Sequence, residues 1–269
     1  MTRVAHLPKR GVIAVAGPDR VSFLNGLVSN DVAKAVPGGA VWAALLTAQG
    51  RYVTDFFILA DEEQLLLDLP RAAVAEVATK LRRYRLRAAV SVEDQSDAYR
   101  VYAAWGGMPP PVPVTAPDPR LCDAGFRCLS RTEITANATD LDYAAHRLIL
   151  GLPDGPPDLE PGKTLLLEAG FNELGGVAWD KGCYMGQELT ARTKYRGLVK
   201  RRLVPVRLGA DAPEPGTPVF AGDAEMGTLR SGVGRMALAM LRTEALGQVL
   251  RAGDALVAPV IPNWMDIQT

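Results

Sequence analysis

The pattern of apolar residues changes near residue 200, and this change restricts the possible folds more than any other feature of the chain. Beyond Lys200 the apolar runs are short and are separated by Pro and Gly; they are Leu203–Leu208, Pro218–Ala221, Gly227–Gly234, Arg235–Leu241 and Ala255–Pro259. Short runs with this punctuation are typical of a small antiparallel barrel or sandwich. We therefore predict a β-rich C-terminal domain over residues 200–269, although the composition of Met236–Leu246 also suits a helix.

The residues before this boundary combine strand and helix patterns. An Ala-rich run at Arg71–Arg87 has apolar residues on one side and predicts a helix. Thr139, followed three residues later by Asp142, predicts a second, capped helix over Thr139–Leu150. Runs that predict strands surround the first helix; they are Val41–Ala48, Tyr52–Ala60, Gln64–Leu69, Ala88–Glu93 and Tyr99–Trp105. This order favours an α+β body over residues 1–199 rather than a doubly wound parallel sheet.

One segment of this body is too rich in proline for a helix or a central strand. Six of the fourteen residues in the range 106–119 are proline. Proline removes a backbone donor and fixes φ, so it is excluded from helix interiors and from central strands. We expect a linker or a long surface loop here, and this is where the body would divide if it contains two subdomains.

The amino-acid composition bears on which partners the chain is expected to bind and on the cellular compartment in which it is expected to work. Thirty basic residues balance thirty acidic ones, so overall charge gives no reason to expect direct binding to nucleic acid. No apolar run approaches the roughly 20 residues of a membrane helix, so no membrane contact is expected. Three cysteines cannot form a disulfide framework, and two histidines argue against a histidine-built zinc site. We predict no metal site and, in the absence of a secretory signal, a cytoplasmic protein.

Positive charge is nevertheless concentrated locally, around a cysteine. The range 181–202 contains seven basic residues and one acidic residue, and the range 80–87 contains five basic residues and no acidic one. Either cluster alone is typical of a solvated surface, but the two together favour an anionic ligand. Cys183 follows Lys181 and precedes an expected helix over Tyr184–Tyr195. A helix N-terminus and a nearby cation both favour a thiolate, whereas a lone cysteine is often a small buried residue.

The same segment resembles a known family. The run KGCYMGQE at Lys181–Glu188, continued through Arg192 and Arg196-Gly197, is similar to the signature of the YgfZ-type folate-binding proteins. These are iron–sulfur cluster assembly factors related to the T-protein, the aminomethyltransferase of the glycine cleavage system. Further segments are similar to the folate-domain pattern and to the T-protein stretch whose glutamate holds the pterin; they are Phe23–Gly26, Asn30–Val32, Thr47–Arg51, Asp55 and Leu167–Gly170. The resemblance covers most of residues 12–208.

This resemblance implies a T-protein-like folate-binding body with mixed sheets and helices, a C-terminal β-barrel, and tetrahydrofolate or a one-carbon derivative as cofactor. It implies catalytic roles for Cys183, Lys181 and Asp55. Glu168 and Asp55 match acids of one folate site, so they are expected to line the same pocket. Residues expected to contact the cofactor, through its pterin donors, its aromatic ring or its anionic tail, are Glu168, Trp179, Tyr184, Gln187, Glu188, Arg192 and Arg196.

Two functions remain open from the sequence, and a third, a nucleic-acid-binding module that uses the two basic clusters, is the weakest because the chain has no motif of that class. T-proteins do not characteristically have a cysteine at the position of Cys183, which favours an accessory factor for iron–sulfur cluster assembly or repair. Such a factor would work with iron–sulfur assembly proteins or with client enzymes, including those that modify tRNA. The acids Asp55 and Glu168 are T-protein-like, so a folate-dependent aminomethyltransferase is the alternative, and whether the chain is an enzyme stays open.

Overall fold

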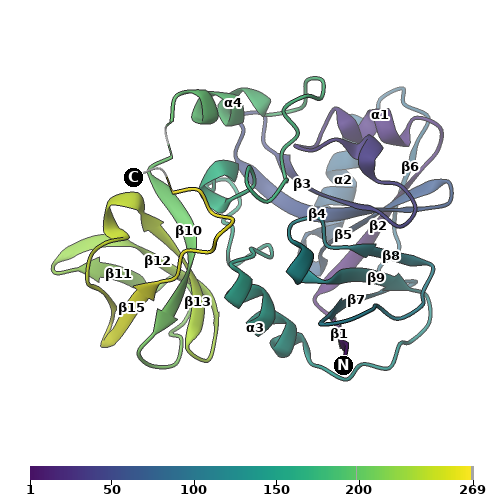
Figure 1. Ribbon diagram of the computed structural model, residues 1–269. Coiled ribbons are helices and arrows are strands. Elements are labelled where there is room, and N and C mark those ends of the chain that lie inside the picture. The colour runs from purple at the N-terminus through teal and green to yellow at the C-terminus, as the bar shows by residue number, and fades with distance from the viewer. Residues whose placement is uncertain (198, 268–269) are drawn as a thin grey trace.

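A computed structural model describes residues 1–197 and 199–267 of the chain. Two antiparallel sheets with their helices form a body, and a closed barrel stands beside it (Figure 1). The predicted α+β body with a C-terminal β-barrel is therefore confirmed. No helix in the described part of the chain is long and apolar enough to cross a membrane.

The larger sheet of the body has five strands in the order β3-β4-β5-β2-β6, with antiparallel neighbours throughout. One of its faces is covered by two helices, α1 (Arg20–Asn25) and α2 (Val74–Tyr84), whose buried apolar side chains pack against it. The other face packs against the smaller sheet of the body. Because both faces are covered, the strands are almost continuously apolar. The strands are β2 (Arg10–Ala16), β3 (Ala40–Leu46), β4 (Tyr52–Asp61), β5 (Gln64–Pro70) and β6 (Ser91–Asp94).

The smaller sheet has the order β1-β7-β9-β8, and its apolar side chains share a core with the other face of the larger sheet. Its strands are β1 (Arg3–His6), β7 (Arg100–Trp105), β8 (Val114–Pro117) and β9 (Phe126–Ser130). The proline-rich range 106–119 is thus not entirely a loop, because it contains β8. This strand lies at the edge of the sheet, where a missing backbone donor is tolerated.

Two further helices join the body to the barrel. Helix α3 (Asp140–Leu150) begins with the predicted capping box, in which Thr139 and Asp142 bond each other's backbone N–H groups. Helix α4 (Gln187–Tyr195) begins three residues later than predicted, because Gly186 adopts a left-handed conformation with φ of 81° immediately before it. Short 3-10 helices lie at Val32–Lys34 (η1), Arg71–Ala73 (η2), Cys122–Ala124 (η3), Leu166–Ala169 (η4) and Thr243–Ala245 (η5).

The barrel closes in the order β10-β13-β12-β11-β14-β15 and surrounds its own apolar core. Met236–Leu246, where the sequence also suited a helix, forms a strand followed by the single turn η5. The strands are β10 (Arg201–Leu208), β11 (Pro218–Ala221), β12 (Ala224–Val233), β13 (Met236–Arg242), β14 (Leu250–Ala252) and β15 (Ala255–Pro259).

Candidate functional site

Two segments that carry the family resemblance meet at the N-terminus of α4. The turn between β3 and β4 contains Gly50, and a Cβ on this glycine would lie 2.6 Å from Leu189 Cβ and 2.7 Å from Gly186 O. A Cβ on Gly186 would in turn lie 2.5 Å from Thr47 O. Both glycines also have φ near +80°, which side chains rarely adopt. The two segments therefore need glycine at these positions in order to touch.

The same turn borders a cavity that contains Glu168. This cavity has a volume of about 350 Å³. The Glu168 side chain, on η4, is only 6% exposed, and its Oε1 accepts a hydrogen bond of 3.2 Å from Arg201 Nε. Arg201 is half exposed at the start of β10. The other residues that line the cavity are Arg51, Glu160, Gly162, Lys163, Thr164, Arg230 and Met240.

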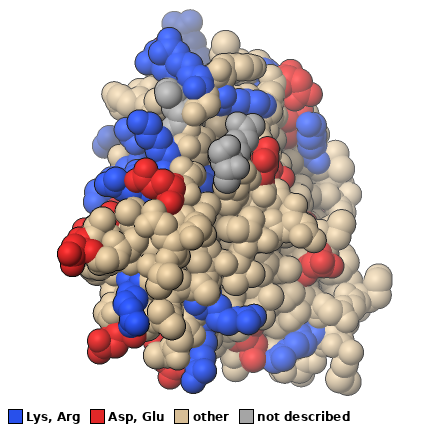
Figure 2. Space-filling view, turned by 60° about the vertical axis from the view of Figure 1, so that its left-hand side comes forward, with Lys and Arg blue, Asp and Glu red and all other residues tan. Residues whose placement is uncertain are grey.

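Positive charge dominates the wall of the Glu168 cavity. Four basic residues line it against two acidic ones, which leaves a formal charge of +2. The barrel closes one side, since Arg201, Arg230 and Met240 all belong to its strands. Lys and Arg side chains also gather in the upper part of the face shown in Figure 2, at the height of α4 in Figure 1. The cavity is suited to a ligand with an anionic part.

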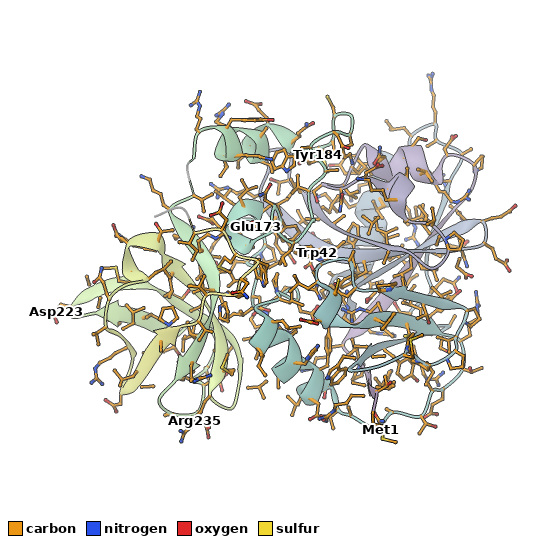
Figure 3. All side chains as sticks on the ribbon, in the orientation of Figure 1. Met1, Trp42, Glu173, Tyr184, Asp223 and Arg235 are labelled. Carbon is orange, nitrogen blue, oxygen red and sulfur yellow. The ribbon has the colours of Figure 1, made fainter. Side chains whose placement is uncertain are left out.

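Asp55 does not line this cavity, although the sequence predicted one pocket for both acids. It lies on β4 and is 1% exposed. Its two oxygens accept hydrogen bonds from Trp42 Nε1 at 2.9 Å and from the Tyr52 hydroxyl at 2.7 Å. Trp42 stacks on Phe171 at 3.9 Å in the crowded interior of the body (Figure 3). Burial raises the pKa of the Asp55 carboxyl, although Arg10 opposes this shift.

Lys181 forms bonds that the sequence did not predict. Its Nζ donates to the backbone oxygens of Asn25 at 2.7 Å, Val28 at 2.8 Å and Asn30 at 2.8 Å. An ammonium group has three N–H donors, so all three are used. Burial lowers the pKa of Lys181 to about 8. The side chain thus ties the segment before α4 to the end of α1 and to the chain that follows it. Its predicted effect on the thiol of Cys183 stays a prediction.

Cys183 is exposed, in an irregular segment ahead of α4. Because the helix begins at Gln187, Cys183 is three residues ahead of the N-cap Gly186 and not at the helix N-terminus, where the sequence predicted it. Cys122 is also exposed and Cys128 is buried. Within residues 1–197 and 199–267, no three His, Cys, Asp or Glu side chains are grouped so as to hold a metal ion.

The other predicted cofactor contacts lie outside the Glu168 cavity. Tyr184 is buried in the core of the body, and burial raises its pKa to about 12. Trp179 donates to Asn172 Oδ1 at 2.9 Å and lies under the ammonium of Lys194.

The other four residues predicted to contact the cofactor belong to α4 and to its C-cap. Gln187 Oε1 accepts from the backbone N–H of Tyr184 at 3.2 Å. Glu188 and Arg192 form an ion pair on the exposed face, and Arg196 is exposed at the C-cap. None of the range 80–87 lines the cavity either.

Sequence reasoning missed most of the cavity wall. Arg51 belongs to a recognised segment and could have been found there. Lys163 and Arg230 belong to no motif. Arg230 is on β12, so the packing of the barrel on the body brings it to the cavity.

Comparisons with known proteins identify the family. Residues 200–267 match the family described as the CAF17 C-terminal beta-barrel domain. The mitochondrial iron–sulfur cluster assembly factor IBA57 of Homo sapiens is 32% identical over 300 residues, which cover 96% of this chain and 84% of the relative. The chain belongs to the IBA57 family. The factor of Mus musculus is 31% identical with the same coverage. The homologue of Mycosarcoma maydis is 36% identical, and the match covers 76% of this chain and 57% of that longer relative.

These relatives bear on two expectations. The expected family of iron–sulfur cluster assembly factors is confirmed at the level of the IBA57 family, and the finer YgfZ-type label, which names a related family, is not confirmed. The predicted cytoplasmic location is contradicted, because the IBA57 relatives are named as mitochondrial proteins. The fold is similar to that of glycine cleavage system aminomethyltransferase T from Bartonella henselae, with a TM-score of 0.74 and 16% identity over 99% of this chain and 87% of that one. At this identity the likeness concerns the fold alone.

Proposed function

We propose that the chain binds tetrahydrofolate, or a one-carbon derivative, in the Glu168 cavity, and that it thereby supports assembly or repair of iron–sulfur clusters. The observation that carries the proposal is a buried carboxylate in a cavity whose other charged residues are mostly cations. A pterin presents adjacent ring N–H and amino donors, and one carboxylate accepts both together. Arg201 is half exposed, which gives it room to turn away as Glu168 takes up these donors.

The rest of the cavity suits the remainder of the cofactor. The p-aminobenzoyl-glutamate tail is anionic, and Arg51 and Lys163 would hold it by charge at the cavity wall. A volume of about 350 Å³ lies in the range of small-ligand sites. The cofactor would supply one-carbon chemistry, while the residues of this chain bind and orient it.

The thiol of Cys183 would be the group that acts on the iron–sulfur cluster or on the protein that carries the cluster. Its thiol is exposed, so a second protein can reach it. A single thiol leaves most ligand positions of a cluster to the partner, which would be an iron–sulfur assembly protein or a client enzyme, such as one that modifies tRNA. We propose residues 1–199 as the folate-binding domain and residues 200–269, of which 268 and 269 lie outside the described residues, as the barrel domain.

A titration of tetrahydrofolate into the purified protein under anaerobic conditions tests the binding proposal. We expect Glu168→Gln to weaken binding by about tenfold or more, because an amide cannot accept both pterin donors. Glu188→Gln is the matched control, since Glu188 lies on the exposed face of α4. Equal affinity of the Glu168→Gln variant and the wild type would contradict the proposal.

The aminomethyltransferase alternative would need Asp55 at the folate, and Asp55 is enclosed by Trp42 and Tyr52. We expect no methylene-tetrahydrofolate from an aminomethyl-lipoyl carrier.

A further inference from the structure

A cationic turn follows the end of α2 on the surface of the body. The helix ends at Tyr84, and all six residues of the range 82–87, which we call the α2 turn, are exposed. A hydrogen bond of 2.8 Å from the Ala88 N–H to the Arg85 oxygen closes it. Leu86 is 87% exposed, and among the large apolar side chains of the described residues only Met1 is more exposed. Tyr84 is 39% exposed, so two apolar side chains face water at this turn.

Leu86 also has an unusual backbone conformation. Its φ is 45°, and among the described non-glycine residues only Glu62 shares a positive φ. Glycine, asparagine and aspartate adopt this conformation more readily than leucine does, so leucine costs the fold free energy at this position. Because its side chain is almost fully in water, packing within the chain offsets little of that cost. A leucine at such a position points to contact with something outside the chain.

The positive charges of the α2 turn are not neutralised by ion pairs. No basic residue of the range 80–87 forms an ion pair with a described residue; these residues are Lys80, Arg82, Arg83, Arg85 and Arg87. Arg82 and Arg85 donate to the backbone oxygens of Val92 and Val90, which carry no formal charge. All five cations are therefore available to an anionic partner.

The acidic side chains around the turn do not cancel this charge. They are Asp19, Glu76 and Glu93. Asp19 Oδ2 accepts a hydrogen bond of 2.8 Å from the Ala89 N–H, and Arg20 follows it in the chain. When the three acids are counted against the five cations and Arg20, a formal charge of +3 remains. The turn thus combines an excess of positive charge with exposed apolar groups.

We propose that the α2 turn docks on the surface of a bilayer that contains anionic lipids. The arginines would lie among the headgroups, and Leu86 would enter the boundary between the headgroups and the acyl chains. The ring of Tyr84 suits the same level of the membrane. Contact with the surface needs no membrane-spanning helix, so the lack of a long apolar run does not oppose it. The proposal does not depend on folate binding.

The apolar residues favour a bilayer over a nucleic acid. The phosphates of a nucleic acid would attract the same arginines, but they offer no apolar phase for Leu86. A bilayer with anionic headgroups offers both kinds of contact within the length of one side chain.

Cosedimentation of the full chain with lipid vesicles tests this proposal. Phosphatidylcholine vesicles with about 30% phosphatidylglycerol supply the negative surface, and pure phosphatidylcholine vesicles are the neutral counterpart. We expect binding to the anionic vesicles that weakens as salt is added, and at least about tenfold weaker binding to the neutral ones.

The charge and the leucine are tested separately. Arg83→Gln combined with Arg87→Gln should weaken binding about 25-fold, because each basic residue near an anionic surface contributes about fivefold. Arg207→Gln combined with Arg235→Gln is the matched control, since both arginines are exposed on the barrel, and it should keep the wild-type affinity.

Leu86→Asn should weaken binding about tenfold, because it removes the apolar side chain. Urea unfolding of this variant should show no loss of stability, since asparagine tolerates a positive φ. Val249→Asn is the control, because Val249 is an apolar residue of the barrel that is 75% exposed.

Absence of binding to the anionic vesicles at about 0.1 M salt would overturn the proposal. Unchanged binding of the Leu86→Asn variant, or equal losses in the barrel controls, would overturn it too. Binding of a single-stranded oligonucleotide that the Arg83 and Arg87 substitutions abolish, without binding of vesicles, would assign the turn to nucleic acid instead.

Discussion

Replacing Lys181 by methionine separates the two roles that this residue could have. The ammonium donates three hydrogen bonds of 2.7, 2.8 and 2.8 Å to backbone oxygens at the end of α1 and just after it. Methionine has a similar length and keeps the apolar stem, but it leaves these three oxygens without their donor. A hydrogen bond of this kind contributes about 1 kcal/mol net, so Lys181→Met should lower the free energy of unfolding by about 3 kcal/mol.

Two measurements on the same variant test this reasoning. Urea unfolding should show the loss of stability, while the pH profile of Cys183 alkylation should superimpose on that of the wild type. Lys194→Met is the matched control: this lysine is exposed and lies over the Trp179 ring, so its loss should cost less than about 1 kcal/mol. Unchanged stability together with slower alkylation near neutral pH would refute our account and restore the sequence-based prediction that Lys181 activates the thiol.

Two further changes test how the body is held together. Burial alone would raise the pKa of Asp154, but Arg10 and Arg147 outweigh it and lower the pKa to about 2. Asp154→Asn should therefore cost about 2 kcal/mol at pH 7, and the difference should vanish as the pH falls from about 4 through 2; a constant difference in acid would contradict this. Gly50→Ala should cost about 3 kcal/mol, because its Cβ would clash with the N-terminus of α4. Gly38→Ala has a similar positive φ but open space around it, and should cost only about 1 kcal/mol; equal losses in urea unfolding would show that the close approach is unimportant.

The fold could be predicted where local patterns decide it. Short apolar runs with Pro and Gly between them specified the barrel, and the pair Thr139 and Asp142 specified the start of α3. The strands β1 and β2 were missed. The start of α4 was misplaced because Gly186 adopts a left-handed conformation, which delays the helix. The spacing of apolar residues does not reveal this conformation.

The candidate site was less predictable because its parts meet through packing. Glu168 was found from a motif, and in the structure it lines a cavity, while its role in binding stays a prediction. The role of Lys181 could not be found, because its partners are backbone oxygens, which any sequence would supply. Asp55 belongs to a recognised pattern, yet Trp42 and Tyr52 enclose it, and only the three-dimensional packing reveals this.

We propose that this chain supports iron–sulfur cluster assembly through the thiol of Cys183. The most direct test is the activity of an iron–sulfur enzyme in cells that lack their own IBA57-family protein and express variants of this chain. We predict that the wild type restores the activity, that Cys183→Ala does not, and that Cys122→Ala, which removes the other exposed thiol, restores it fully. Full recovery with Cys183→Ala, at equal protein levels, would contradict the account.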